Sequence, residues 1–189
     1  MIRIAVLGDI GSGKSHIAKL FGYPVFDADS EVLKLYKKSR KCYIKLKKIL
    51  PDYIRSFPVQ KNKLAEAVGD NSKNLKKIIK VVHPEVRSRM NKFIKINKNK
   101  KFIILDIPLF LENKLYKKKD ILIFIDAKKN QINKRLKWRI KSNEKIIKKL
   151  RKFQLPLEIK RKKSQFIIKN DFKNKNVKKS VKKIIKYLN

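Results

Sequence analysis

The chain has 189 residues, of which 42% are hydrophobic and 36% are charged, and its formal net charge is +38. This length and apolar content are typical of one globular domain and exclude a disordered protein or an array of domains. The single cysteine excludes an internal disulfide, no Cys/His cluster has zinc spacing, and no apolar run approaches the roughly 18 residues of a membrane helix. Because the N-terminus also lacks the pattern of a signal peptide, we expect a cytoplasmic protein without a membrane partner.

The positive charge has two explanations. Clustered Lys and Arg often bind nucleic-acid phosphates. Here only nine of the 53 basic residues are Arg, and the Lys residues are spread along the whole chain beside many Asn and Ile, as a coding sequence rich in adenine and thymine predicts. We therefore expect no specific nucleic-acid partner, and binding to nucleic acid stays open as the alternative.

Apolar runs alternate with helical patterns along the chain. The apolar runs predict strands at residues 2–8, 23–29, 101–108, 120–126 and 165–170. Helical patterns lie between and after them, at residues 15–22, about 30–98, 129–163 and 177–188, with breaks expected at Pro51, Pro58, Gly69 and His83–Pro84. Continuous apolar strands separated by helices predict an α/β fold in which helices cover both faces of a five-stranded parallel sheet. Ligands of such folds bind at the carboxyl ends of the strands.

The sequence GDIGSGKS, residues 8–15, lies between the first predicted strand and the first predicted helix. It matches the pattern GxxxxGK[ST] of a P-loop, whose glycines let backbone amides approach phosphates closely. Lys14 is then expected to reach the terminal phosphates and Ser15 to bind Mg²⁺. The expected ATP-binding residues are Ile10, Gly11, Ser12, Gly13, Lys14 and Ser15. The alternative is an ordinary glycine-rich turn between a strand and a helix.

Asp106 ends a predicted buried strand, where a carboxylate is costly unless it is paired or faces a metal. It suits the position that orients hydrated Mg²⁺ beside Ser15, and its alternative role is to cap the segment that begins at Pro108. The strand continues as Ile-Pro-Leu where a GTPase has DxxG, and no guanine-binding Asn-Lys-x-Asp follows a later strand. These differences exclude a GTPase.

The apolar run at residues 23–29 places Asp27 and Asp29 at the end of the second predicted strand. The two-residue period of a strand sends both side chains to the same face, toward the phosphate loop. A carboxylate there can accept the proton of an attacking hydroxyl during phosphoryl transfer. The alternative is helix capping by Asp29 or Ser30, although Ser30 alone can serve as the cap.

With these motifs in view, the chain resembles the dephospho-CoA kinase family of P-loop kinases. The resemblance covers nearly the whole chain and is carried by GDIGSGKS, VFDADSEV, VVHPEVR, ILDIPLFLENKLY, QINKRLKWR and RKFQLPLEIK, in that order. It implies the phosphorylation of the ribose 3′-hydroxyl of dephospho-CoA by ATP with Mg²⁺, the final step of coenzyme A biosynthesis. The implied catalytic base is Asp29.

The resemblance also implies a division of the single domain. The core comprises about residues 1–29, 100–130 and 164–189, a helical insertion at about 30–98 receives dephospho-CoA, and a helical lid covers about 131–163. The implied contacts of dephospho-CoA include Asp29, His83 and the DIPLFLE residues Pro108, Leu109 and Glu112.

Two arginines of the predicted lid, Arg135 and Arg139, lie four residues apart and therefore on one helix face. Arginine presents a planar fork of donors that suits a transferring phosphate, so we expect both to be catalytic together with Lys14. The alternative is a solvated basic helix face.

The chain departs from the family pattern at three places. Asp9 replaces the second of two glycines, Gln165 stands where an Asp is common, and the lid arginine usually near Gln154 is displaced to Arg151. We expect ATP binding to survive, because the side chain of Asp9 can point away from the phosphates.

The sequence thus predicts a kinase acting on ATP and dephospho-CoA, as a monomer or a small homo-oligomer. Two alternatives stay open: a P-loop ATPase coupled to nucleic-acid binding, and a kinase of another small molecule.

Overall fold

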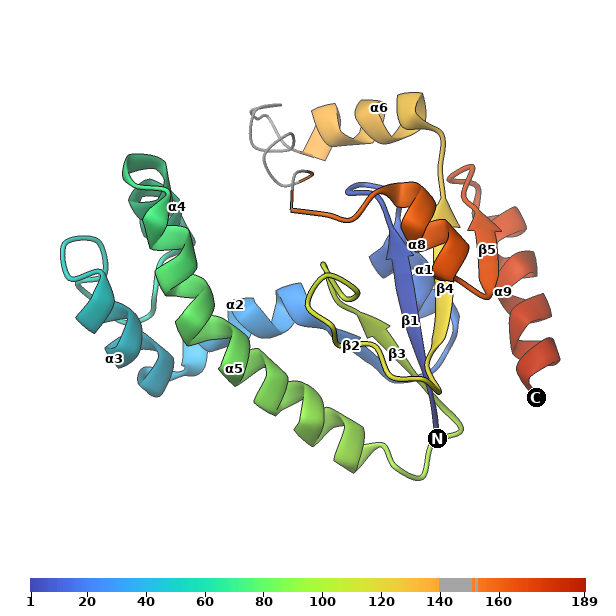
Figure 1. Cartoon of the computed structure of the whole chain (residues 1–189), viewed down its shortest axis with the longest axis horizontal. Helices are drawn as coiled ribbons and strands as arrows, with labels where there is room; N and C mark the ends of the chain where they lie inside the picture. The colour runs from blue at the N-terminus through green and yellow to red at the C-terminus, as the bar shows by residue number, and fades with distance from the viewer. Residues whose placement is uncertain (140–150, 152) are drawn as a thin grey trace. The chain divides into compact units, whose positions relative to one another are not determined.

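The computed structural model describes residues 1–139, 151 and 153–189, although the side chains of Trp138 and Arg139 are not among the described ones (Figure 1). The chain divides into two compact units. One comprises Met1–Asp27 and Asn97–Asn189, and the other comprises Ala28–Ile96.

The first unit is built on a parallel sheet of five strands. The strands are β1 (Ile2–Gly8), β2 (Val25–Asp27), β3 (Phe102–Asp106), β4 (Ile121–Asp126) and β5 (Phe166–Lys169). They are arranged in the order β2-β3-β1-β4-β5, with β1 at the centre. All neighbouring pairs are parallel. The predicted α/β P-loop fold with a five-stranded parallel sheet is therefore confirmed.

Helices cover both faces of this sheet. Figure 1 shows α1 (Lys14–Leu20) behind the sheet and α8 (Leu157–Lys163) in front of it. The apolar residues of α1 and of α9 (Asn174–Leu188) pack with alternate strand residues, such as Ile4 and Val6 of β1, in one core. The remaining described helix of this unit, α6 (Lys129–Arg139), follows β4. The strands are buried on both faces, which explains why their apolar residues form continuous runs and do not alternate with polar residues.

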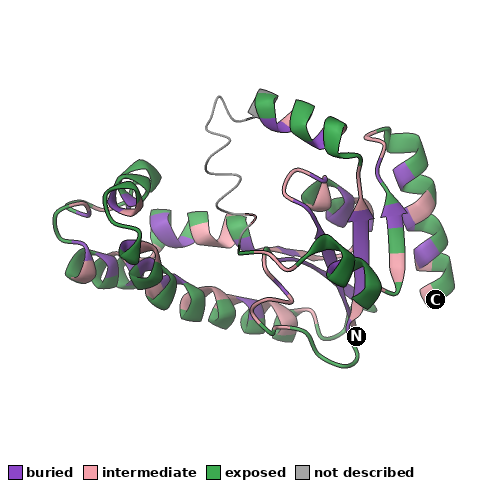
Figure 2. Ribbon diagram, turned by 45° about the horizontal axis from the view of Figure 1, so that its top comes forward, coloured by how far each residue is buried: buried purple, intermediate pink, exposed green. Residues whose placement is uncertain are grey.

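The second unit is a helical body built around one long helix. Three shorter helices, α2 (Ala28–Lys38), α3 (Arg40–Ile49) and α4 (Lys61–Asp70), each contact α5 (Lys73–Ile96). Their apolar stripes form a core that includes Leu35, Leu46, Ile54 and Val82. Figure 2 shows exposed residues along most of the outer surface of these helices, where the lysines lie. The helices are therefore amphipathic despite their high charge.

The prediction for the second strand was wrong at its end. Strand β2 ends at Asp27, and α2 begins at Ala28, so that Asp29 lies in the first turn of a helix and not in the strand. Ser30 is likewise inside the helix and is not its cap. The two-residue period of a strand therefore does not apply to Asp29. From Ala28 onward the spacing of Ala28, Glu31 and Leu35 is that of a helix. An acidic residue in the first turn also favours the helix through its dipole.

The helix break predicted at His83–Pro84 was also wrong, because α5 continues through Pro84. A proline inside a helix removes one backbone hydrogen bond and costs about 3 kcal/mol. The buried residues Ile78, Val82 and Met90 lie on both sides of Pro84, and their packing offsets this cost. The other predicted breaks agree with the structure, since α3 ends before Pro51 and α4 ends one residue after Gly69.

None of the described helices is both long enough and apolar enough to cross a membrane.

Candidate active site

The phosphate loop leaves the carboxyl end of the central strand and leads directly into α1. Gly11 and Gly13 have left-handed backbones, with φ of 82° and 91°, which favours glycine at both positions. The loop is closed by a hydrogen bond from the Ser12 amide to the Asp9 carbonyl (3.1 Å), and Lys14 Nζ donates to the carbonyls of Gly8 (3.3 Å) and Asp9 (2.8 Å). The sequence therefore forms the compact turn that a P-loop needs, with its lysine folded over the loop.

Asn170 supports the loop from the end of β5. Its Nδ2 atom donates to the Ser12 carbonyl (2.8 Å), and its Oδ1 atom accepts from the amide of Phe172 (2.9 Å). A Cβ atom at Gly13 would lie only 2.5 Å from Asn170 Nδ2, so the approach of the two segments requires glycine. Asn170 was not among the residues predicted for the site. The available signal was its position as a polar residue at the carboxyl end of a strand.

The first part of the predicted lid packs beside the loop. Ile132 and Leu136 of α6 form a small apolar cluster with Ile10 and Phe172. The guanidinium carbon of Arg135 lies 4.5 Å from the centre of the Phe172 ring, which is a cation–π contact. Arg135 is thus beside the loop, and its role in phosphoryl transfer stays a prediction. Arg139 is the last residue of α6, and its predicted role depends on a side chain outside the described residues.

Two aspartates occupy paired positions of neighbouring strands at the carboxyl edge of the sheet. Strands β2 and β3 are paired in a register that places Asp27 opposite Asp106. Asp106 is buried, with 4% of its surface exposed, whereas Ser15 is exposed in the first turn of α1. In the described residues no group of three or more His, Cys, Asp and Glu side chains could hold a metal. Mg²⁺ needs only one or two carboxylates because it keeps several waters, and the hard oxygen donors Ser15 and Asp106 fit this preference.

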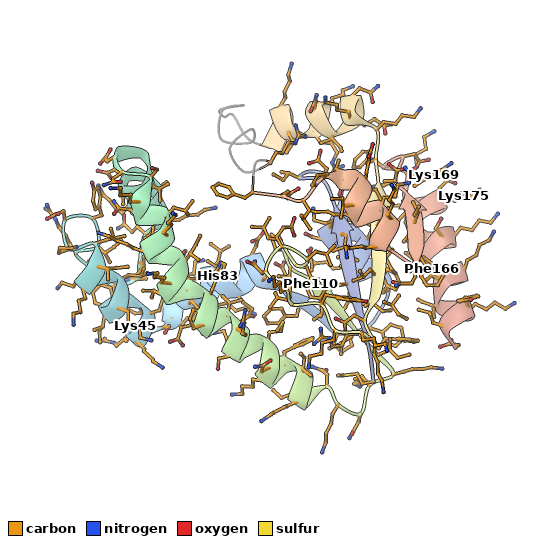
Figure 3. The ribbon with its side chains drawn as sticks, viewed as in Figure 1. Lys45, His83, Phe110, Phe166, Lys169 and Lys175 are labelled. Carbon is orange, nitrogen blue, oxygen red and sulfur yellow. The ribbon has the colours of Figure 1, made fainter. Side chains whose placement is uncertain are left out.

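The segment after β3 carries the predicted substrate residues Pro108, Leu109 and Glu112. Pro108 is exposed, and Leu109 has a left-handed backbone with φ of 58°, which is unusual for a residue with a side chain. Phe110 is fully buried and fixes the segment in the sheet unit (Figure 3). The segment therefore combines a buried anchor, Phe110, with an exposed proline.

Glu112 anchors another segment of the same unit. Its Oε1 atom accepts from Lys160 Nζ (2.9 Å) and from the amide of Leu155 (2.8 Å). Burial raises the pKa of this carboxyl, but the hydrogen bonds from Lys160 and from backbone amides outweigh burial, and the pKa lies below its usual value. Lys160 is itself buried, with 4% of its side chain exposed. These contacts give Glu112 a structural role, and its contact with substrate stays a prediction.

We expect Glu112→Gln to lower the free energy of unfolding by on the order of 3 kcal/mol at pH 7, because Lys160 would keep a buried charge without its partner. Since the folded pKa of Glu112 is lowered, its stabilising effect is present above about pH 4.5 and is lost as the pH falls through the folded value. Urea unfolding at pH 7 and below pH 4 measures both effects. The matched control is Glu66→Gln, which breaks an exposed pair with Lys63 and is expected to change stability by less than about 0.5 kcal/mol. An equal effect of the two variants would contradict the structural role of Glu112.

His83 projects from the middle of α5 in the helical unit (Figure 3). It lines a hollow of about 820 Å³ together with Lys80, Arg87, Lys92 and Lys95. Partial desolvation lowers the pKa of the imidazole below its usual value, and the charge of Arg87 lowers it further. Both effects favour the neutral form of the ring, in a surface that is otherwise positive.

Two departures from the family pattern have local explanations. The side chain of Gln165 accepts from the amide of Leu122 (2.7 Å), while the Gln165 amide donates to the Leu122 carbonyl (3.0 Å), so this residue extends the pairing of β5 with β4. Asp9 and Arg151 form an ion pair with a shortest distance of 2.8 Å. No feature of the sequence predicted this pairing, because 142 positions separate the two residues.

Comparisons with known proteins agree over the full length of the fold. A sequence family described as dephospho-CoA kinase matches residues 2–176. The dephospho-CoA kinase of Wolbachia sp. subsp. Brugia malayi is 34% identical over 187 residues, which cover 96% of this chain and 95% of that protein. A crystal structure of a Thermus thermophilus protein has a TM-score of 0.80 at 25% identity, and covers 98% of this chain and 96% of its own. The dephospho-CoA kinase of Campylobacter jejuni has a TM-score of 0.66 at 26% identity, with the same coverage.

Proposed function

The chain belongs to the dephospho-CoA kinase family, and from this premise we propose which of its residues carry out the reaction. The reaction is the ATP-dependent phosphorylation of dephospho-CoA in coenzyme A biosynthesis. The observation that carries the assignment is a complete phosphate loop between β1 and α1, in a chain that matches this family over residues 2–176.

We propose that residues 10–15 hold the phosphates of ATP. The amides at the start of α1 and the dipole of this helix attract anions. Lys14, which donates to loop carbonyls in this structure, would exchange these contacts for the terminal phosphates. Mg²⁺ would be held by Ser15 and, through water, by Asp106, and would neutralise charge on the phosphates that these residues orient.

We propose that Asp29 is the general base. It lies in the first turn of α2, two residues beyond the end of β2, and its side chain is exposed. A carboxylate can accept the proton of the ribose 3′-hydroxyl as the phosphoryl group is transferred. The early start of α2 does not oppose this role, since a side chain on a helix is positioned more precisely than one on a loop.

The helical unit Ala28–Ile96 is proposed to receive dephospho-CoA, whose phosphates would be attracted to the positive hollow along α5. The lowered pKa of His83 favours the neutral ring, which can donate or accept a hydrogen bond there, while Lys80 and Arg87 supply charge. Pro108 and Leu109 are the proposed contacts from the segment after β3. The proposed location of the enzyme is the cytoplasm.

Closure of the predicted lid, residues 131–163, over ATP would involve Arg135 and Arg139. Water must be excluded during phosphoryl transfer, because it would otherwise accept the phosphoryl group. Arg135 now lies against Phe172, and a move to the transferring phosphate would exchange a cation–π contact for a stronger charge pair.

The test is the release of ADP from MgATP by the purified protein, with dephospho-CoA, adenosine, shikimate or single-stranded RNA supplied separately at physiological ionic strength. We expect release only with dephospho-CoA, with a product that gains one phosphate. Stimulation by RNA alone would instead support an ATPase coupled to nucleic acid. Stimulation by shikimate or adenosine would support a kinase of another small molecule.

A further inference from the structure

The phosphate loop of this chain contains an acidic residue. Asp9 directly follows the last residue of β1 and is 8% exposed. Its Oδ1 atom accepts from the amide of the next residue, Ile10, at 2.7 Å. The carboxylate is thus fixed at the entrance of the segment that we propose to bind phosphates.

A negative charge at this place opposes the binding of a nucleoside triphosphate. Two like charges in a partly buried site repel each other strongly, because the effective dielectric constant there is well below that of water. A carboxylate without a partner would also be costly to bury. A chain with Asp9 in its loop therefore needs a cation that neutralises it.

Arg151 supplies this cation in a fork-shaped contact. Its Nε atom donates to Asp9 Oδ1 (3.1 Å), and its Nη2 atom donates to Asp9 Oδ2 (2.8 Å). The exposed fractions of the side chains are 31% for Arg151 and 11% for Asp9, so the carboxylate is the more enclosed partner. Such a bidentate contact fixes the orientation of both groups.

We propose that Arg151 is a positioning residue for nucleotide binding, which acts by neutralising Asp9 and holding its carboxylate in one orientation. This inference rests on the proposed binding of ATP by the loop. If Arg151 instead left Asp9 to bind the phosphates itself, the carboxylate would remain without its partner beside a polyanion. The pair is therefore expected to persist when nucleotide binds.

Residues that follow Arg151 in the sequence have contacts of their own that do not involve Asp9. Leu155 donates through its backbone to Glu112 (2.8 Å), and Lys160 pairs with the same carboxylate (2.9 Å). Asp9 and Arg151 also border a hollow of about 390 Å³ with Gln154 and Leu157, where a substituted side chain has room. Replacing either partner of the pair should consequently change the charge beside the loop without detaching the segment.

The experiment is a double-mutant cycle read by calorimetric titration of the full chain with MgATP and, separately, with adenosine. The variants are Arg151→Gln, Asp9→Asn and the two combined. We expect Arg151→Gln to weaken ATP binding by about tenfold or more, because the negative charge of Asp9 is then no longer neutralised and repels the phosphates. In the double variant the charge is absent, and ATP affinity should return to within about threefold of the wild type. Adenosine carries no charge, and its affinity should be the same in all four proteins.

Arg161→Gln is the matched control. Arg161 pairs with Asp126 at 3.2 Å, the two side chains are 50% and 34% exposed, and the substitution removes the same single positive charge. We expect it to change ATP affinity by less than about twofold, since exposed pairs are screened. A loss as large as that of Arg151→Gln would show that only net charge matters and would overturn the proposal.

Two further outcomes would overturn it. If Arg151→Gln weakens ATP binding equally in the wild type and in the Asp9→Asn variant, Arg151 acts independently of the Asp9 carboxylate. If adenosine binding falls together with ATP binding, the pair has only a structural role, and thermal unfolding of the variants would show a matching loss of stability. Failure of the wild type to bind ATP at all is a different result, because it overturns the proposed function before any variant is compared.

Discussion

Asp29→Asn is expected to lower kcat by about 10²- to 10⁴-fold, because Asn has nearly the same shape but cannot accept the proton of the attacking hydroxyl. Asp29 is exposed in the first turn of α2, and Asn keeps its size and polarity, so we expect the fold to stay intact. Affinities for ATP and for dephospho-CoA should stay close to those of the wild type. Steady-state ADP release together with calorimetric titration of each substrate separates the chemical step from binding.

The matched control for this variant is Asp52→Asn, which removes the same charge from an exposed residue between α3 and α4. It should leave kcat unchanged. Full turnover of Asp29→Asn with intact substrate binding would show that another group accepts the proton. A loss of dephospho-CoA affinity without a loss of kcat would assign Asp29 to binding alone.

Gly13→Ala is expected to abolish ATP binding at millimolar nucleotide and to lower the free energy of unfolding by about 2 kcal/mol. The backbone of Gly13 has φ of 91°, which costs a residue with a side chain about 1–2 kcal/mol. The added Cβ atom would lie 2.5 Å from Asn170 Nδ2 and would displace the hydrogen bond from Asn170 to Ser12, worth about 1 kcal/mol. The loop would then open, and its amides would no longer converge on the phosphates.

Gly22→Ala separates backbone strain from the contact with Asn170. Gly22, just after α1, also has a left-handed backbone, with φ of 72°, but no heavy atom lies within 4 Å of the position that an added Cβ atom would take. We expect a loss of about 1 kcal/mol in unfolding free energy and unchanged ATP affinity. Chemical unfolding and titration with MgATP measure both quantities for the two variants. Normal ATP binding by Gly13→Ala would contradict the tight approach of Asn170 to the loop.

The limits of all five strands could be predicted within two residues, because each strand is a continuous apolar run between polar segments. The phosphate loop could be predicted equally well from the sequence, since its glycines and Lys14 occur at fixed spacing between a strand and a helix. Two local predictions failed. Asp29 was assigned to a strand by alternation over too few residues, and a break was expected at Pro84 because sequence shows the cost of proline without the packing that offsets it.

Individual side-chain contacts between distant segments could not be predicted. The pairing of Asp9 with Arg151 joins residues 142 positions apart, and the support of the loop by Asn170 spans 158 positions. Many lysines and arginines in this chain are equally plausible partners for a carboxylate. Only the packed structure selects one of them.

Fold class, phosphate loop and family all follow from the order of the residues, because apolar periodicity and glycine spacing are local properties of the chain. Which charges pair follows only from packing: Asp9 pairs with Arg151, and Glu112 pairs with Lys160. Electrostatic energy depends on distance and burial in the folded chain, and neither quantity is fixed until distant segments have come together.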